Sequence, residues 1–231
     1  MATAAQGRYA YWCDGAEVPV DERFEVVPQT RGLLVMSNRS APGTLLTVES
    51  VFGVEGGVDA TLTWTSELEG TAAHAAVRHR WDGTVLEASG LVDGRDSAGR
   101  LDAPGASYFP LMRVFSGRTL LRLMADAAKG GDGIDVVTPD IRDPKAIDRW
   151  LAPLLDRRRI ASARPTTLEV DGIARACYEV EYLGGSYDQA ASVWVDDGGL
   201  LLRYTWDQPG VGDWDVRLCD VEGDWPRPRE W

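Results

Sequence analysis

The chain has very little lysine. Two of its 24 basic residues, Lys129 and Lys145, are lysines, which leaves 22 arginines against 36 acidic residues. The formal net charge is −12, and only the short run Arg157-Arg158-Arg159 breaks the acidic pattern. Nucleic acid and anionic membrane surfaces are therefore not expected partners, because binding to them requires cations that neutralise phosphates. The preference for arginine, together with abundant Ala, Gly, Asp and Val, is typical of a GC-rich bacterial genome.

Cysteine and histidine are almost as scarce. Cys13, Cys177 and Cys219 are far apart and form no CxxC pair, and His74 and His79 are the two histidines. This excludes a disulfide framework and makes a His- or Cys-rich metal site improbable. The sequence also lacks GxSxG, HExxH, P-loop and dinucleotide-binding motifs. We therefore expect reduced thiols, no metal and no cofactor.

Long apolar runs are missing as well. No stretch approaches the roughly 20 apolar residues that a membrane-spanning helix needs. Residues 1–7 are small and polar, without the apolar core of a secretion signal. The sequence thus predicts no membrane span and a cytoplasmic location.

What the chain does contain is a succession of β-strands. Apolar and polar residues alternate in segments of about ten residues, and Asp-Gly or Gly-Gly pairs separate many of these segments, as a β-meander requires. The predicted strands are 8–13, 17–27, 32–37, 44–52, 58–68, 72–81, 84–92, 166–170, 173–183, 187–195, 200–207 and 214–221.

The middle third is predicted to be helical. Leu120, Leu121, Met124 and Ala128 share one face of a helix at 118–128. Asp143-Pro144 resembles a helix start, and the apolar spacing that follows predicts a second helix at 144–155. Arg157-Arg158-Arg159 would then be cations at the C-terminus of that helix.

The predicted fold is mainly β (α+β). Residues 1–231 form a single domain, in which one curled antiparallel meander or half-barrel carries a helical insertion at about 116–156. The two helices are expected to cover the open side of the sheet, since a long single sheet must curl around something.

Residues 167–206 carry a resemblance to a known family. Val170-Asp171-Gly172, Val193-Trp194-Val195-Asp196 and Leu202-Arg203-Tyr204 form two hairpins that resemble the lipoprotein-carrier-like (Lol-type) half-barrel proteins. The resemblance covers about forty of the 231 residues. It implies a curved half-barrel that closes over an apolar cavity. The shuttles of that family carry a signal peptide, and none is expected here.

Three polar residues in apolar strand surroundings are candidate catalytic groups. His79 shares strand parity with Val77 and Trp81, and a histidine facing a cavity can act as an acid or base near neutral pH. Glu49 would have a raised pKa if it faced a cavity, and Arg113 would hold a ligand carboxylate or enolate or pair with Glu49. A purely structural role is the alternative for each.

Nine tryptophans is a high number for this length. They fit the pleated surface of a sheet, so cross-strand packing in the core explains them as well as an aromatic cavity does. The candidate ligand-binding residues are Trp64, Trp81, Tyr178, Trp194, Tyr204 and Trp206.

Two functions from different classes fit this pattern. The first is a cofactor-independent cyclase or isomerase of bacterial specialised (polyketide- or terpene-type) metabolism, which would act through proximity and charge stabilisation on a hydrophobic small molecule. The alternative is a non-catalytic carrier of a lipid or another hydrophobic ligand. A β interaction module is a third reading. The sequence predicts neither the ligand nor the oligomeric state.

Overall fold

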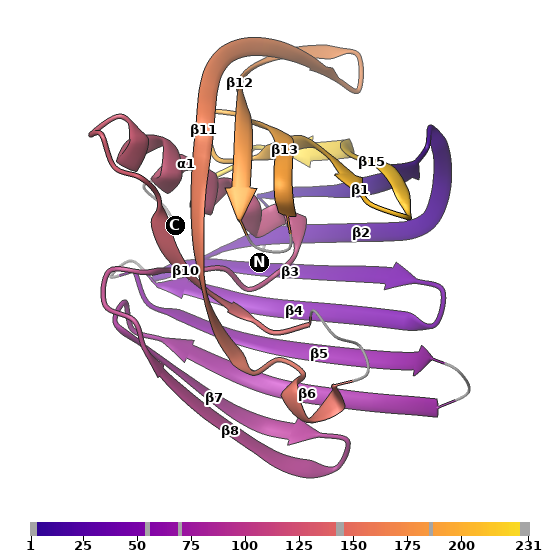
Figure 1. Cartoon of the computed structure of the whole chain (residues 1–231), viewed down its shortest axis with the longest axis vertical. Helices are drawn as coiled ribbons and strands as arrows, with labels where there is room; N and C mark the ends of the chain where they lie inside the picture. Colours follow the sequence, from indigo (N-terminus) through magenta and orange to yellow (C-terminus); the bar gives the residue numbers. More distant parts are fainter. Residues whose placement is uncertain (1–3, 54–55, 69–70, 142–145, 185–186, 227–231) are drawn as a thin grey trace.

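The strands follow one another across a single curled sheet in the computed structural model (Figure 1), which describes residues 4–53, 56–68, 71–141, 146–184 and 187–226. Over these residues the strand order is β8-β7-β6-β5-β4-β3-β2-β1-β15-β14-β13-β12-β11-β10-β9. The pairs are antiparallel except β9 with β10. The strands are β1 Ala5–Cys13, β2 Ala16–Gln29, β3 Gly32–Ala41, β4 Thr44–Gly53, β5 Val58–Leu68, β6 Thr71–Trp81, β7 Val85–Val92, β8 Arg95–Asp102, β9 Ser107–Tyr108, β10 Ile134–Pro139, β11 Pro153–Val170, β12 Ile173–Gly184, β13 Tyr187–Val195, β14 Leu201–Gln208 and β15 Gly212–Gly223.

Asp-Gly turns connect several of these strands, as predicted. Asp14-Gly15, Asp93-Gly94 and Asp171-Gly172 all have positive φ at both residues. This conformation matches the twist of a two-residue hairpin, and Asp and Gly adopt it at the lowest cost. The turns thereby set the register that sends every second side chain to the same face of the sheet.

The alternation places the core on the inner face of the curl. Leu46, Val48 and Phe52 of β4 are buried, whereas Leu45 on the same strand is 45% exposed. Because side chains of a strand point alternately to opposite faces, one face of β4 is core and the other faces solvent. The mostly β, barrel-like fold predicted from the sequence is confirmed.

A closing segment, which we define as residues 103–141 and 146–156, lies over the inner face. It contains α1 (Ser116–Ala127), the 3₁₀ turns η1 (Arg113–Phe115) and η2 (Ile147–Arg149), and strands β9 and β10. Phe115 packs on Phe52 at 5.6 Å between ring centroids, and Trp150 stacks on Trp64 at 4.6 Å. These contacts tie the closing segment to β4 and β5.

The prediction of two helices is wrong. The helix expected at 118–128 is α1, which buries Leu120 and Leu123. In place of the helix expected at 144–155, residues 147–149 form the turn η2 and β11 starts at Pro153. Proline lacks an N–H and disfavours helical geometry in the residue before it, so Pro153 prevents the helix from continuing. Asp143 and Pro144 lie outside the described residues.

The arginine run at 157–159 is consequently not a helix terminus. It lies within β11, where the strand alternates its side chains: Arg157 and Arg159 are exposed, while the Arg158 side chain is 11% exposed. Arg157 pairs on the outside with Asp132 and Asp135 at 2.6 and 3.2 Å. Arg158 points to the inside, together with Leu154 and Asp156.

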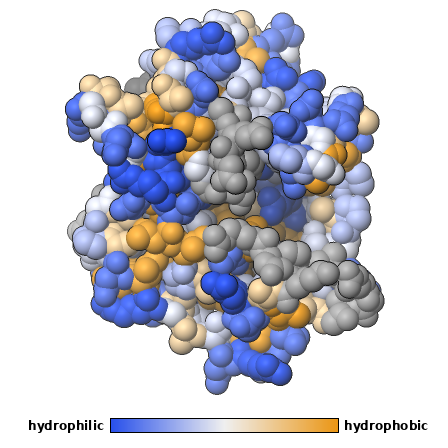
Figure 2. All heavy atoms as spheres, viewed as in Figure 1, coloured by the Kyte–Doolittle hydropathy of each residue, from blue (hydrophilic) through white to orange (hydrophobic). Residues whose placement is uncertain are grey.

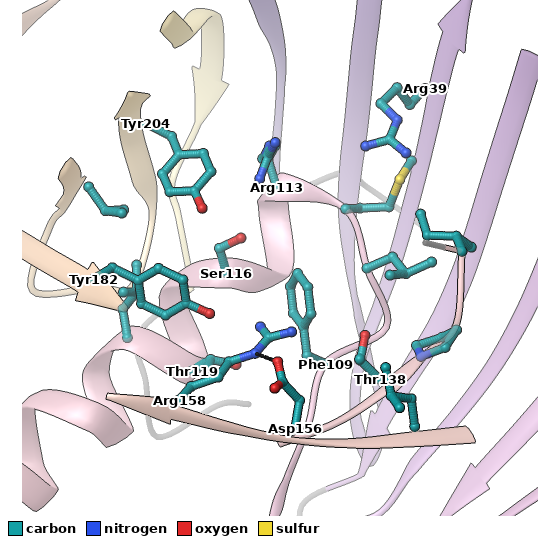
Figure 3. Close-up of a pocket in the computed structure, with 17 residues that line it drawn as sticks. Arg39, Phe109, Arg113, Ser116, Thr119, Thr138, Asp156, Arg158, Tyr182 and Tyr204 are labelled. Atoms are coloured by element: carbon teal, nitrogen blue, oxygen red, sulfur yellow. Dashed lines mark hydrogen bonds and ion pairs between the residues drawn. The ribbon is translucent and has the colours of Figure 1, made fainter. Parts of the chain in front are cut away.

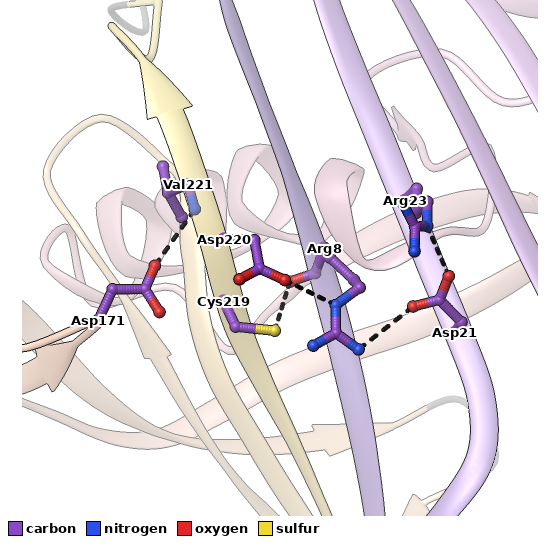
Figure 4. Close-up of polar contacts among 7 residues, drawn as sticks. All are labelled: Arg8, Asp21, Arg23, Asp171, Cys219, Asp220 and Val221. Atoms are coloured by element: carbon purple, nitrogen blue, oxygen red, sulfur yellow. Dashed lines mark hydrogen bonds and ion pairs between the residues drawn. The ribbon is translucent and has the colours of Figure 1, made fainter.

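β1 and β15, the first and last strands in sequence order, lie side by side within the sheet. Ala5 pairs with Gly223, and Cys13 with Trp214. On the outer face Arg8 of β1 joins Asp220 of β15 at 2.9 Å and Asp21 of β2 at 3.4 Å (Figure 4). These ion pairs join β1 to its two neighbouring strands, β2 and β15, on the solvent-facing side of the sheet.

Candidate functional site

A cavity of about 210 Å³ lies between the closing segment and the inner face of the sheet (Figure 3). Its apolar wall includes Phe109, Leu120, Ile141, Leu154 and Val193. In the space-filling view hydrophobic residues gather across the middle of the molecule, with hydrophilic residues around them (Figure 2). The cavity is smaller than the roughly 300–1,000 Å³ of most ligand pockets, so it suits a compact molecule.

The polar part of the lining is rich in arginine. Arg39 of β3, Arg113 of η1 and Arg158 of β11 all contribute, while Asp156 is the one acidic residue among the described lining residues. Arg158 Nε lies 3.3 Å from Asp156 Oδ2, and its guanidinium lies over the Phe109 ring at 5.0 Å. Three guanidiniums thus converge on one cavity in a protein whose net charge is −12.

A strained stretch of backbone delivers Arg113 to this cavity. Leu111 has φ +69°, which a bulky side chain rarely adopts. The Arg113 N–H donates to the carboxylate of Glu22, a residue of β2 with no exposed surface, and the Tyr11 hydroxyl donates to the same carboxylate at 2.7 Å. Glu22 therefore fixes the backbone from which the Arg113 side chain extends.

Arg113 then packs on aromatic rings of β14. Its guanidinium carbon lies 4.5 Å from the Tyr204 ring centroid and 5.2 Å from that of Trp206. Cation–π contacts of this kind hold the orientation of a guanidinium. Of the three candidate catalytic residues, Arg113 is the one that lines the cavity.

His79 faces inward as predicted, but it lies in the packed core and does not line the cavity. It has no exposed surface, and burial lowers its pKa to about 4, so the ring is neutral at neutral pH. Nε2 lies 2.8 Å from the Leu151 carbonyl oxygen, to which it donates, and Nδ1 lies 3.0 Å from the Tyr108 hydroxyl. His79 thereby fixes Leu151, a buried residue with φ +61°.

Glu49 is not brought to the cavity. Its register partners are Met36 and Thr61, and its side chain is exposed on the outer face of β4. The carboxylate that contacts Arg113 is that of Glu22, which accepts the backbone N–H. The prediction placed Glu49 with Leu45 and Thr47, and these residues do share its face, but that face is the solvent side.

Most of the candidate aromatic residues serve the core or the outer surface. Trp64 and Trp81 are buried against Trp150 and Tyr108, Tyr178 is half-buried, and Trp194 lies under Arg203 on the outer face. Trp206 contacts Arg113, and Tyr204 lines the cavity. No tryptophan is found among the described residues of the lining. The sequence analysis missed Arg39, Asp156, Arg158 and Tyr182, which do line it.

A second hollow, formed by residues of β1, β14 and β15, differs from the cavity in its charge balance. It is lined by Trp12, Trp206 and Trp214 together with Arg203 and Arg217. Both arginines pair with Asp215, at 2.8 and 2.7 Å. The inner cavity, with its convergent guanidiniums, is the better candidate site.

Metal-binding clusters and membrane helices do not emerge from the described residues. Within them no three His, Cys, Asp or Glu side chains gather as metal ligands. The helices there are too short and too polar to cross a membrane. Cys13, Cys177 and Cys219 are free thiols.

Fold and cavity together define the class: a β-barrel-like protein built from one curled sheet. Among solved structures, the chain is similar to a β-barrel-like protein of the domain of unknown function DUF1849 from Brucella abortus. The TM-score is 0.58 at 8% identity, over 96% of this chain and 98% of the other. No family model and no curated protein matches the sequence. The likeness supports the fold alone and shows no relation to the lipoprotein carriers that residues 167–206 resemble.

Proposed function

We propose that this protein binds a small hydrophobic molecule in the inner cavity, as a non-catalytic binder or carrier. The observation that carries the proposal is the cavity itself, about 210 Å³ in volume and walled by apolar side chains of the sheet and of the closing segment. Concave, largely apolar sites with a few convergent polar groups are the usual form of a ligand pocket.

The positions of the candidate catalytic groups favour binding over catalysis. A general acid or base must reach the reacting atoms. Glu49 is on the outer face, and both ring nitrogens of His79 are engaged in the core. Neither side chain can exchange a proton with a molecule in the cavity.

A cofactor-independent cyclase or isomerase is the second candidate. Asp156 and Arg158 support it, because a carboxylate and a guanidinium lie together in the cavity. There the carboxylate can take a proton from carbon while the guanidinium stabilises the enolate that forms. An Asp156→Asn variant that still binds ligand but loses turnover would favour this enzyme over a carrier.

Native mass spectrometry of the purified protein tests the binding proposal. We expect wild-type protein to retain a small molecule, and Ser116→Phe, which places a ring in the cavity, to lose it. Ser89→Phe is the control, since Ser89 is exposed on β7. An empty wild-type protein that also fails to bind octan-1-ol in solution would contradict the proposal.

A further inference from the structure

Three arginines give the cavity a positively charged part of its lining. Arg39, Arg113 and Arg158 come from three separate elements and line the same volume of about 210 Å³. Removing guanidiniums from water and bringing like charges together both cost free energy. Nearby anions offset this cost.

Two carboxylates of the protein offset part of this charge. Asp156 pairs with Arg158 Nε, and Glu22 accepts the backbone N–H of Arg113 and is the register partner of Arg39. These carboxylates leave the terminal nitrogens of Arg158 available to a bound anion.

Two threonine hydroxyls in the cavity wall also lack a partner. Thr119 of α1 and Thr138 of β10 are 3% and 5% exposed, and both line the cavity. Within the part of the chain that the structure describes, neither Oγ1 atom makes a hydrogen bond. Buried polar groups are normally satisfied, and leaving one without a partner costs about 1–3 kcal/mol. Each hydroxyl is a donor that an oxygen of a bound molecule can satisfy.

Arg158 is placed to complete this set of donors. Its Nε is taken by Asp156, and one face of its guanidinium lies over Phe109. The terminal nitrogens make no hydrogen bond to any other described residue. α1, β10 and β11, which carry Thr119, Thr138 and Arg158, pack against one another. One cavity thus offers a planar guanidinium and two hydroxyls, which are donors that an oxyanion accepts from.

We infer that the cavity takes an amphipathic molecule with one oxyanion head group, bound by Arg158, Thr119 and Thr138, whose apolar part lies against Phe109 and Leu120. The inference rests on the proposed binding function and specifies its ligand class. Carboxylate and phosphate monoester share the required chemistry. The volume limits the apolar part to a short chain or a single ring.

Isothermal titration with three probes of equal chain length tests the head group. We expect octanoate to bind the wild-type protein about tenfold more tightly than octan-1-ol, because charge-assisted hydrogen bonds exceed neutral ones by that order. Octylamine should bind more weakly than octan-1-ol, since its ammonium would lie against the like charge of Arg158. Octyl phosphate, compared with octanoate, distinguishes the two oxyanions.

Variants locate the binding group. Arg158→Met keeps a long apolar side chain over Phe109 and should abolish the preference for octanoate over octan-1-ol. Thr138→Val should weaken octanoate binding several-fold. Arg157→Met is the matched control, because Arg157 is the neighbouring residue on the exposed face of β11. If Arg158→Met fails to fold, Arg158→Lys replaces it and should retain part of the preference.

The outcomes separate the two proposals. Equal binding of octanoate and octan-1-ol by wild type, or an unchanged preference in the Arg158 variant, overturns the oxyanion inference and leaves the binding function intact. Failure of every probe to bind, octan-1-ol included, overturns the binding function itself.

Discussion

The meander β2–β8 and the closing segment are built by different means. Each meander strand pairs with its sequence neighbours through short turns, and the inner face is mostly apolar. The closing segment has one helix, two 3₁₀ turns and a parallel strand pair among its described residues, and bulky Leu111 and Leu151 have positive φ. Local pattern specifies the first region, and contacts with distant residues specify the second.

Two buried polar residues of the meander provide those contacts. Glu22 accepts the N–H of Arg113, two residues after Leu111, and His79 donates to the carbonyl of Leu151 itself. Strained backbone persists where its surroundings fix it. The difference between the regions thus explains why an apolar sheet face contains a fully buried glutamate and histidine: they hold the segment that forms the cavity.

The largest effect is expected from the protonation of His79, the meander residue that holds Leu151. The pKa of His79 is about 4 in the folded protein against 6.5 for the unfolded chain, so the unfolded chain binds more protons between these values. The stability that depends on neutral His79 is complete above pH 6.5 and falls by about 3 kcal/mol as the pH drops to 4.

Urea denaturation from pH 7.5 to 4.5 measures this loss. His79→Gln, which can keep both hydrogen bonds without titrating, should flatten the dependence on pH. His74→Gln is the control, because His74 is exposed on the same strand. An unchanged slope in His79→Gln would show that other groups cause the loss.

Removing the Glu22 carboxylate should lower the free energy of unfolding by nearly as much. Glu22→Ala leaves the Tyr11 hydroxyl and the Arg113 N–H buried without their acceptor, and we expect a loss of about 3 kcal/mol in the free energy of unfolding. Amide exchange should become faster at Arg113 while it stays slow at Val35 in the meander. Glu25→Ala, on the exposed face of β2, should change stability by less than about 0.5 kcal/mol. Equal effects of the two substitutions would refute the anchoring role.

The smallest effect is expected on the outer face. Arg8 bridges β1 to β2 and β15, but its partner Asp220 is 70% exposed. Solvent screens such pairs, so Arg8→Ala should lower the free energy of unfolding by about 0.5 kcal/mol and by less at high salt. A loss as large as that of Glu22→Ala would mean that outer ion pairs matter as much as the buried anchors.

The difference between the meander and the closing segment also explains which elements can be predicted from the sequence. Strands β5, β6 and β13 were predicted within one residue, because alternation and Asp-Gly turns are local signals. β8 was missed because Arg95–Asp102 is polar on both faces of an edge strand. The spacing of Ile147, Trp150, Leu151 and Leu154 imitates a helix, yet Trp150 is buried through its stack on Trp64.

The site was predictable only where one residue stands out in apolar surroundings. Arg113 was found in this way, within 108–115. Arg158 was hidden in a run of three arginines whose alternation appears only once β11 is known to be a strand. Glu22 lies between Asp21 and Arg23, and nothing local distinguishes it as buried.

The pairing of β1 with β15 has a consequence for biosynthesis. While the ribosome is still making the chain, β1 can pair only with β2, and its other edge stays open until residues 212–223 emerge. An open strand edge is a site of unwanted association, and contacts between such distant residues form slowly. The nascent protein therefore remains vulnerable to aggregation until nearly all of the sheet has been translated.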